Sequence, residues 1–326
     1  MIIGEATRLK HIYSSADFAD VKDCLIAGGN FFAENSELSL KELQEKNPAW
    51  NKNDIIFGLK RLLKSDYCVF PLYHNVNGKE NVRLLYLPAK RKRDFFVILL
   101  AGGAYGTVCT MVEALPVAAK LNDLGVDCFC LNYQTATAES FENGLMPAPL
   151  DDLAATIRFI RQKKDFFVFD NLDYIVCGFS AGGHVASLWG TDTLGAFRYN
   201  LPQAIGIMLA YPLITMENIP DSPVKSYMCT GMFGKDYSIN NIRKYDASRN
   251  ATKNYPATYI VRALDDTTVS PKDADMLKNT LSSLSIPCFI EQAQSGNHGF
   301  GLGTDTPLCG WQKRAVEFLT RSGITL

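Results

Sequence analysis

The sequence predicts an α/β fold with a mostly parallel central sheet, an antiparallel edge on its N-terminal side and helices on both faces. From residue 94 onward, apolar runs of strand length alternate with segments whose apolar residues recur every three or four positions. This alternation is typical of parallel strands joined by helices. Two earlier apolar runs, 67–74 and 81–87, flank Asn77-Gly78, a strong signal for an antiparallel hairpin. With 326 residues and 47% hydrophobic content, the chain can bury a large core.

Residues 1–65 are predicted to form a helical N-terminal extension to this domain. The helical pattern at 38–48 starts beside a serine and stops at a proline, and the apolar residues of 54–64 recur at three and four positions. The apolar face of such helices must be covered. The extension therefore packs on the flank of the main domain, which is the default, or lies over its site as part of a lid.

The elements of the main domain are expected in a definite order. A long irregular connection is expected at 215–256, either a cap that lines a pocket or a surface excursion. The predicted strands and helices are strand 95–100, helix 111–124, strand 126–133, helix 150–162, strand 174–177, helix 181–189, strand 205–213, strand 258–264, helix 271–284, strand 287–292 and helix 308–319.

Charge and cysteine content exclude several classes of function. There are 33 basic and 34 acidic residues, so no field favours nucleic acid or an anionic membrane surface. No apolar run is long enough to span a membrane, and the first ten residues lack the pattern of a secretory signal, so we expect a cytoplasmic protein. The nine cysteines are then predicted to be free thiols, several of them core residues.

One motif stands where a predicted strand meets a predicted helix. Gly178-Phe179-Ser180-Ala181-Gly182 fits Gly-x-Ser-x-Gly, with a strand-like run before it and a helical pattern after it. In this context the motif predicts a nucleophile elbow, a turn so tight that the serine backbone is strained and the glycines are needed to avoid collisions. Short matches also occur by chance in loops. The interpretation therefore depends on an acid, a base and an oxyanion donor elsewhere in the chain.

A glycine-rich segment, residues 101–106, follows the first buried strand of the main domain. Its Ala-Gly-Gly-Ala-Tyr-Gly sequence has little bulk, so its backbone N–H groups can approach a ligand. A dinucleotide site would need Gly-x-Gly-x-x-Gly and a later acidic residue, and both are missing. We therefore expect Gly103 and Ala104 to donate N–H groups to an oxyanion, together with Ala181 after the serine. An ordinary glycine-rich turn is the alternative.

Two neighbouring carboxylates compete for the role of the acid. Asp265 and Asp266 follow the predicted strand 258–264, beyond the elbow, where an acid is required. We choose Asp266, because Asp-x-x-Val shortly before a proline is typical of the loop that carries the acid. Asp265 is then a capping or solvated residue. For either carboxylate, an N-cap ahead of helix 271–284 is the alternative.

Of the four histidines, only His298 comes after the acid. His11 lies in the extension, His74 at the hairpin, and His184 inside the elbow helix, where its ring would point away from Ser180 or simply pack. His298 follows the last predicted strand in a glycine-rich loop and can reach back over the sheet edge. The order serine, acid, histidine is that of the α/β-hydrolases. No second histidine or cysteine lies at ligand spacing, which disfavours a metal site.

Together these motifs resemble the α/β-hydrolase esterases, and more narrowly their carbohydrate-acetyl-ester and xylan-esterase-like branch. The resemblance covers the chain from about residue 94 to its C-terminus, and it implies an α/β-hydrolase fold with residues 66–326 as the catalytic domain. The motifs that carry it are 101–105, 178–184, 266–269 and 298–303.

The resemblance implies acyl transfer to water. Ser180 is expected to attack an ester carbonyl, His298 to act as general base and then general acid, and Asp266 to fix the imidazole. No cofactor or metal is implied, and the expected partner is a small-molecule ester rather than nucleic acid or a membrane. The oligomeric state is left open.

The substrate is expected to be an ester of a small, acetyl-like acyl group, which the branch suggests is carried by a carbohydrate. Gly102, Tyr105 and Phe179 are the expected substrate-binding residues. The small acyl group is expected because the rings of Tyr105 and Phe179 would crowd the elbow and the oxyanion loop, which is the glycine-rich segment 101–106. Two alternatives remain: an amidase or peptidase that uses the same three side chains, and a non-catalytic binding protein that retains the fold.

Overall fold

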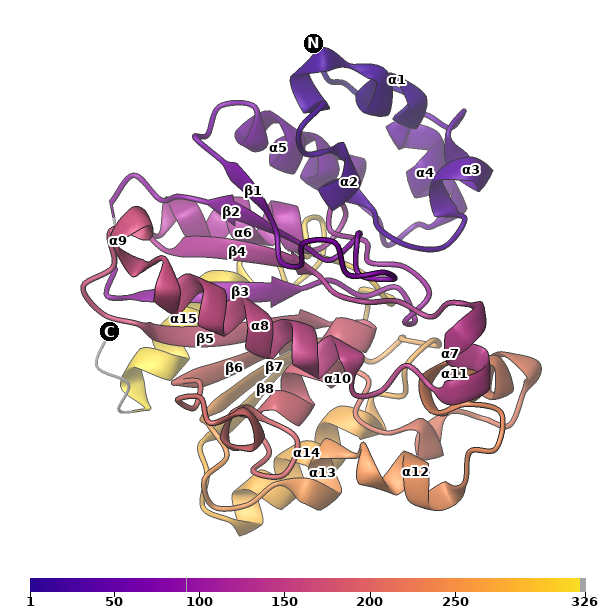
Figure 1. The fold of residues 1–326 in the computed structure, drawn as a ribbon, viewed down its shortest axis with the longest axis vertical. Coiled ribbons are helices and arrows are strands. Elements are labelled where there is room, and N and C mark those ends of the chain that lie inside the picture. The colour runs from indigo at the N-terminus through magenta and orange to yellow at the C-terminus, as the bar shows by residue number, and fades with distance from the viewer. Residues whose placement is uncertain (92, 323–326) are drawn as a thin grey trace.

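The computed structural model describes residues 1–91 and 93–322, and its centre is one eight-stranded sheet with the order β1-β2-β4-β3-β5-β6-β7-β8 (Figure 1). The crossover order of the central strands is that expected when helices connect parallel neighbours. The strands are β1 (Cys68–Pro71), β2 (Arg83–Leu87), β3 (Phe95–Leu100), β4 (Asp127–Asn132), β5 (Asp173–Phe179), β6 (Gly206–Ala210), β7 (Thr258–Ala263) and β8 (Cys288–Ala293).

The sheet is mixed in the way the sequence predicts. β1 pairs with β2 and β2 with β4 in antiparallel register, whereas every pair from β4 through β3 to β8 is parallel. Every residue of β3, β4, β6 and β7 is buried, because helices cover both faces. This burial explains why the strands are continuous apolar runs instead of alternating ones. The predicted architecture, a mostly parallel sheet with an antiparallel N-terminal edge and helices on both faces, is confirmed.

Helices lie on both sides of the sheet. In Figure 1, α8 and α10 lie in front of the sheet, and α6 and α15 lie behind it. α10 begins at the residue immediately after the end of β5, so its N-terminus lies at the carboxyl edge of the sheet. The helices of the main domain outside the 215–256 connection are α6 (Ala114–Asp123), α7 (Ala138–Asn143), α8 (Ala148–Gln162), α9 (Lys164–Phe167), α10 (Ser180–Trp189), α14 (Lys272–Ser283) and α15 (Trp311–Arg321).

The N-terminal extension is helical, and it covers one end of the domain (indigo in Figure 1). The serine start expected for the helix at 38–48 is present, since Ser39 and Glu42 form a reciprocal capping box at α4. α5 lies against α6, and Gly58 makes this approach possible because a Cβ there would lie 3.1 Å from the backbone nitrogen of Pro116. The helices are α1 (Leu9–Ser14), α2 (Lys22–Leu25), α3 (Phe31–Asn35), α4 (Leu40–Lys46) and α5 (Lys52–Leu62).

The connection at 215–256 differs from the irregular segment that we expected. It contains three helices, α11 (Pro223–Phe233), α12 (Ile239–Lys244) and α13 (Ala247–Asn250). α11 packs against α7, as Figure 1 shows at the edge of the molecule. Helices of this length are marginal in isolation, so this packing, and not a strong local pattern, explains why they form.

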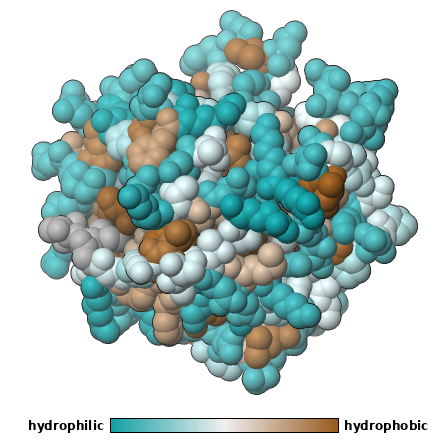
Figure 2. All heavy atoms as spheres, turned by 90° about the horizontal axis from the view of Figure 1, so that it is seen from below, coloured by the Kyte–Doolittle hydropathy of each residue, from teal (hydrophilic) through white to brown (hydrophobic). Residues whose placement is uncertain are grey.

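The molecular surface and the thiols add two observations. Figure 2 shows one face, which is mostly hydrophilic with apolar atoms in small separate patches. All nine cysteines are free thiols, and most of them are buried. Within residues 1–91 and 93–322, no helix combines the length and the apolar character needed to cross a bilayer.

Candidate active site

Ser180 lies on a strained turn between β5 and α10. Its φ is +50°, in the left-handed region that a residue with a Cβ seldom adopts. The flanking glycines are required here. A Cβ at Gly182 would lie 2.0 Å from the carbonyl oxygen of Leu100, and one at Gly178 would lie 2.3 Å from that of Gly182. The elbow predicted from the motif is therefore present.

The ends of three strands bring the predicted serine, histidine and acid together. The Nε2 atom of His298 lies 2.8 Å from Ser180 Oγ, and its Nδ1 atom lies 2.7 Å from Asp266 Oδ2. The Ser180, Asp266 and His298 side chains follow β5, β7 and β8, whose carboxyl ends share one edge of the sheet. Both distances are within the range of good hydrogen bonds.

The two neighbouring carboxylates have different partners. Asp266 is buried, and its Oδ1 atom accepts hydrogen bonds from the N–H groups of Thr268 (2.8 Å) and Val269 (2.9 Å), which leaves Oδ2 to face His298. Asp265 instead accepts the N–H groups of residues 296 and 297 at 3.1 and 2.8 Å. Asp266 therefore orients the imidazole, whereas Asp265 fixes the loop that carries it.

Three backbone N–H groups are available near Ser180. The N–H groups of Gly103, Ala104 and Ala181 donate no hydrogen bond within the described residues. Gly103 has a φ of +136° and Ala104 a φ of +51°, so this loop turns in a way that ordinary strand-to-helix connections do not. Ala181 adds the N-terminus of α10, where the free N–H groups carry a partial positive charge.

Glu113 is a site residue that the sequence interpretation did not identify. Its carboxylate accepts the N–H of Gly102 and the hydroxyl of Tyr211, the latter at 3.0 Å. Tyr211 in turn accepts the N–H of Gly301 at 3.1 Å. Burial raises the pKa of Glu113, and the hydrogen bond from Gly102 opposes that shift. An acidic residue at the start of an otherwise apolar helix was the signal for it.

Gly102 is therefore engaged by Glu113, and the other two expected substrate-binding residues lie in the core. Tyr105 is 1% exposed, and its hydroxyl lies 2.7 Å from His184 Nδ1. Phe179 is fully buried, with Tyr211 as an aromatic neighbour. Substrate contact by Tyr105 and Phe179 stays a prediction, and the structure places both side chains away from the hollow over Ser180.

His184 is a structural residue within α10. It is fully buried, and its Nε2 atom lies 2.6 Å from the carbonyl oxygen of Tyr245. Burial lowers the pKa of His184 to about 4, so the ring is neutral at pH 7. In the neutral form Nε2–H donates to the Tyr245 carbonyl and Nδ1 accepts the hydroxyl of Tyr105.

A hollow of about 240 Å³ opens over Ser180 and His298. Its lining includes Gly102, Gly103 and Ala104 of the glycine-rich loop, and Phe31, Asn47 and Trp50 of the N-terminal extension. None of the described residues that line it comes from 215–256. The structure thus puts part of the extension beside Ser180 and His298, where we expected flank packing by default.

Among curated proteins, the chain is similar to a xylanase and to an acetylxylan esterase. It is 24% identical over 227 residues to endo-1,4-beta-xylanase B of Butyrivibrio fibrisolvens, which is 68% of this chain and 34% of the xylanase. It is 25% identical over 212 residues to an acetylxylan esterase of Xylanibacter ruminicola, which is 64% of this chain and 41% of the esterase. The chain thus spans only about a third to two fifths of the length of these relatives.

Solved structures and a family model agree with this fold. An acetyl ester-xyloside bifunctional hydrolase from Caldicellulosiruptor lactoaceticus matches with a TM-score of 0.65 at 24% identity, over 78% of this chain and 96% of that one. The carboxylesterase Cest-2923 from Lactobacillus plantarum matches with a TM-score of 0.63 at 21% identity, over 79% and 98% of the two chains. The model of the BD-FAE family matches residues 84–281, more than half of the sequence. The chain therefore belongs to the BD-FAE family of α/β-hydrolases.

Proposed function

We propose that the chain is a serine hydrolase that cleaves small, acetyl-like esters of carbohydrates through an acyl-enzyme. The observation that carries this proposal is the continuous hydrogen-bonded series from Ser180 Oγ through His298 to Asp266 Oδ2. It faces three N–H groups that have no partner within the described residues. A nucleophile, a base with its orienting acid, and oxyanion donors are the complete set for acyl transfer.

In the first step the oxygen of Ser180 attacks the ester carbonyl carbon. His298 Nε2 accepts the hydroxyl proton as the new C–O bond forms, and the imidazolium that results is stabilised by Asp266 across 2.7 Å. The carbonyl oxygen becomes an oxyanion beside the N–H groups of Gly103, Ala104 and Ala181. Each such donor contributes about 3–4 kcal/mol of transition-state stabilisation.

Collapse of the tetrahedral intermediate breaks the bond to the alcohol. His298 Nε2–H donates its proton to the departing alkoxide, which leaves an acyl group on Ser180. A water molecule then attacks the acyl carbon while His298 accepts its proton. The second collapse returns that proton to Ser180 and releases the carboxylic acid, so the protein is regenerated without a cofactor in the balance.

Two observations support a small acyl group on a sugar. The hollow of about 240 Å³ lies below the range of roughly 300–1,000 Å³ that is usual for pockets that enclose a whole ligand, so only part of a substrate fits within it. The Xylanibacter relative is named an acetylxylan esterase, and the xylanase relative also acts in xylan degradation by its name. An acetyl group on a xylose unit satisfies both observations.

The proposal is tested by chemical labelling and turnover. A fluorophosphonate probe should label the native chain at Ser180 and fail to label a Ser180→Ala variant. Acetylated methyl xyloside should be deacetylated, with acetate measured directly, and the matching acetamide should be cleaved much more slowly. Absence of labelling would favour a non-catalytic binding protein, and preferred cleavage of the amide would favour an amidase.

A further inference from the structure

The N-terminal extension supplies a wall of the site that the family match, residues 84–281, does not include. We propose that Phe31, Asn47 and Trp50 form a subsite for the sugar ring in the alcohol half of the ester. This inference rests on the proposed function and deepens it. It is carried by the way the extension is fixed, by the position of Trp50 beside the catalytic histidine, and by the free polar groups of the wall.

Backbone pairing fixes the extension to the oxyanion side of the site. Ala27 and Val108 exchange two backbone hydrogen bonds, at 3.1 and 2.8 Å, and Met111 N–H donates to the carbonyl of Leu25 at 2.7 Å. Gly28 allows the close approach, since a Cβ there would lie 2.4 Å from Thr135 Oγ1. These hydrogen bonds hold the segment just before Phe31 against residues 108–111.

A second anchor lies on the histidine side. The Nδ2 atom of Asn51 donates to Asp305 Oδ2 at 2.9 Å, which ties the start of α5 to the segment after the His298 loop. Trp50 immediately precedes this anchor. A Cβ at Gly299 would lie 3.1 Å from Trp50 Nε1 and 3.4 Å from its Cδ1, so the indole lies directly over the residue that follows His298.

This position identifies which half of the ester the wall faces. His298 must return its proton to the departing alcohol, so that alcohol lies next to His298 in any productive complex. Gly299, the residue against which Trp50 lies, lines the same hollow as His298 and Ser180. A wall against Gly299 therefore faces the alcohol half of the ester.

The chemistry of the wall fits a sugar ring. The rings of Phe31 and Trp50 are 5.6 Å apart and only partly buried, which offers apolar surface on which the C–H face of a pyranose can lie. The side-chain amide of Asn47 and the Nε1–H of Trp50 have no hydrogen-bond partner within the described residues. Rings that bind the face of a sugar and free polar groups that bind its hydroxyls are a specific combination.

The activity test compares two acetate esters that differ in the alcohol. For acetylated methyl xyloside, Trp50→Leu should lower kcat/KM about tenfold, mainly by raising KM. For vinyl acetate, which has no ring, kcat/KM should stay within about twofold. Phe31→Leu should behave in the same way with a smaller effect. Equal losses on both esters, or no loss on either, would overturn the subsite.

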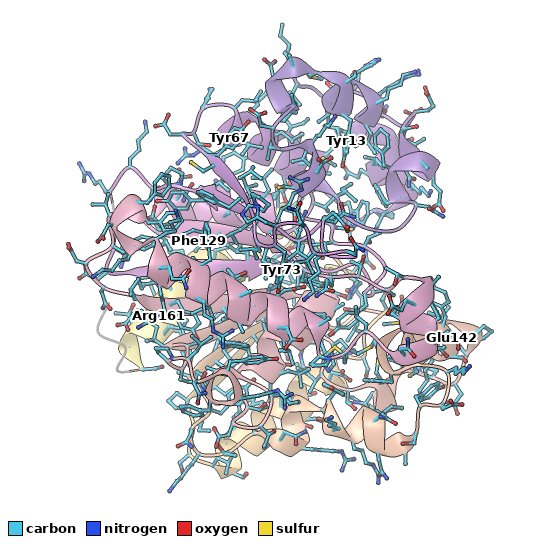
Figure 3. All side chains as sticks on the ribbon, viewed as in Figure 1. Tyr13, Tyr67, Tyr73, Phe129, Glu142 and Arg161 are labelled. Atoms are coloured by element: carbon cyan, nitrogen blue, oxygen red, sulfur yellow. The ribbon has the colours of Figure 1, made fainter. Side chains whose placement is uncertain are left out.

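The matched control is Phe32→Leu. Phe32 is adjacent to Phe31 and is also half-buried, but its ring packs on Tyr13 at 4.2 Å inside the extension, where Figure 3 labels Tyr13. Phe32 is not among the residues of the wall. It should leave the preference for the xyloside over vinyl acetate unchanged. A loss of that preference as large as that of Trp50→Leu would contradict the inference.

A binding test separates this inference from the proposed function. In Ser180→Ala protein, acetylated methyl xyloside should change the tryptophan fluorescence, and the change should vanish when Trp50→Leu is added. Trp189 and Trp311 are fully buried, so Trp50 is the tryptophan that a ligand can reach. If the native chain is inactive but this signal is present, the subsite stands and the hydrolase proposal fails. If the chain is active and the signal is absent, the subsite fails alone.

Discussion

The buried His184 should make the protein less stable in mild acid by an amount that the structure determines. Its ring accepts the hydroxyl of Tyr105 and donates to the carbonyl of Tyr245, an arrangement that only the neutral ring can make without rotating its partners. Burial lowers the pKa of the ring from its ordinary value of 6.5 to about 4. Because the ring is fully buried, solvent does not screen this shift.

The direction of this pH dependence follows from the number of protons that the folded and unfolded chains bind. Between pH 6.5 and 4 the unfolded chain binds a proton at this histidine and the folded chain does not, so the free energy of unfolding rises with pH in this window. The contribution is complete above pH 6.5 and is lost as pH falls toward 4. At about 1.4 kcal/mol per pKa unit it amounts to about 3 kcal/mol. That is a large part of a typical stability of about 5–15 kcal/mol.

The assay compares His184→Gln with the native chain by urea unfolding at pH 7, 6, 5 and 4. Glutamine cannot titrate. From pH 7 to pH 4 the free energy of unfolding of the variant should therefore fall by about 3 kcal/mol less than that of the native chain, even if the variant is less stable at pH 7. His11→Gln, the same substitution at an exposed histidine, is the matched control. Parallel pH curves for the native chain and His184→Gln would refute the reasoning.

Three further outcomes are expected. Asp266→Asn should lower kcat by about 10⁴ without unfolding the chain, because the imidazole loses its tautomer, whereas Asp265→Asn should cost far less; ester turnover measures both. Gly182→Ala should destabilise the fold by about 3 kcal/mol or more, since its Cβ would lie 2.0 Å from a carbonyl oxygen. Thermal unfolding checks this, with Gly4→Ala as the control because a Cβ at Gly4 would lie in open space. Glu113→Ala leaves two buried donors without an acceptor, so we expect the free energy of unfolding to fall by about 2–6 kcal/mol. We also expect a lower kcat with little change in KM. An unchanged kcat would show that the oxyanion loop does not need this acceptor.

The parts of the site that the sequence predicted are those that local rules determine. The elbow is defined by glycine spacing and a strand-to-helix change, and Ser180 indeed adopts a positive φ. The positions of Asp266 and His298 follow from their order along parallel strands, which end at one edge of the sheet. The choice between Asp265 and Asp266 needed one further local cue. In the structure Asp266 faces His298.

The parts that the sequence did not predict depend on contacts between distant segments. The periodicity of its apolar residues shows that α5 buries one face. Only the structure shows that this face lies against α6 and that the Trp50 side chain reaches Gly299. The position of Tyr105 also depends on distant contacts. Ala104 and Tyr105 both have a positive φ, +61° for Tyr105, and the resulting turn buries the Tyr105 side chain beside His184. Residue type alone does not reveal such a turn.

Glu113 and Tyr211 explain why the active-site loops keep their relative positions. The oxyanion loop and the His298 loop follow different strands. The hydrogen bond between Ser180 and His298 would not by itself hold the backbone N–H groups of the oxyanion loop in place. Glu113 accepts the N–H of Gly102 and the hydroxyl of Tyr211, and Tyr211 accepts the N–H of Gly301. One buried network therefore spans both loops. Because a buried network must be fully satisfied to be stable, displacing either loop costs hydrogen bonds at the other, which keeps the glycine-rich loop and the imidazole in fixed relative positions.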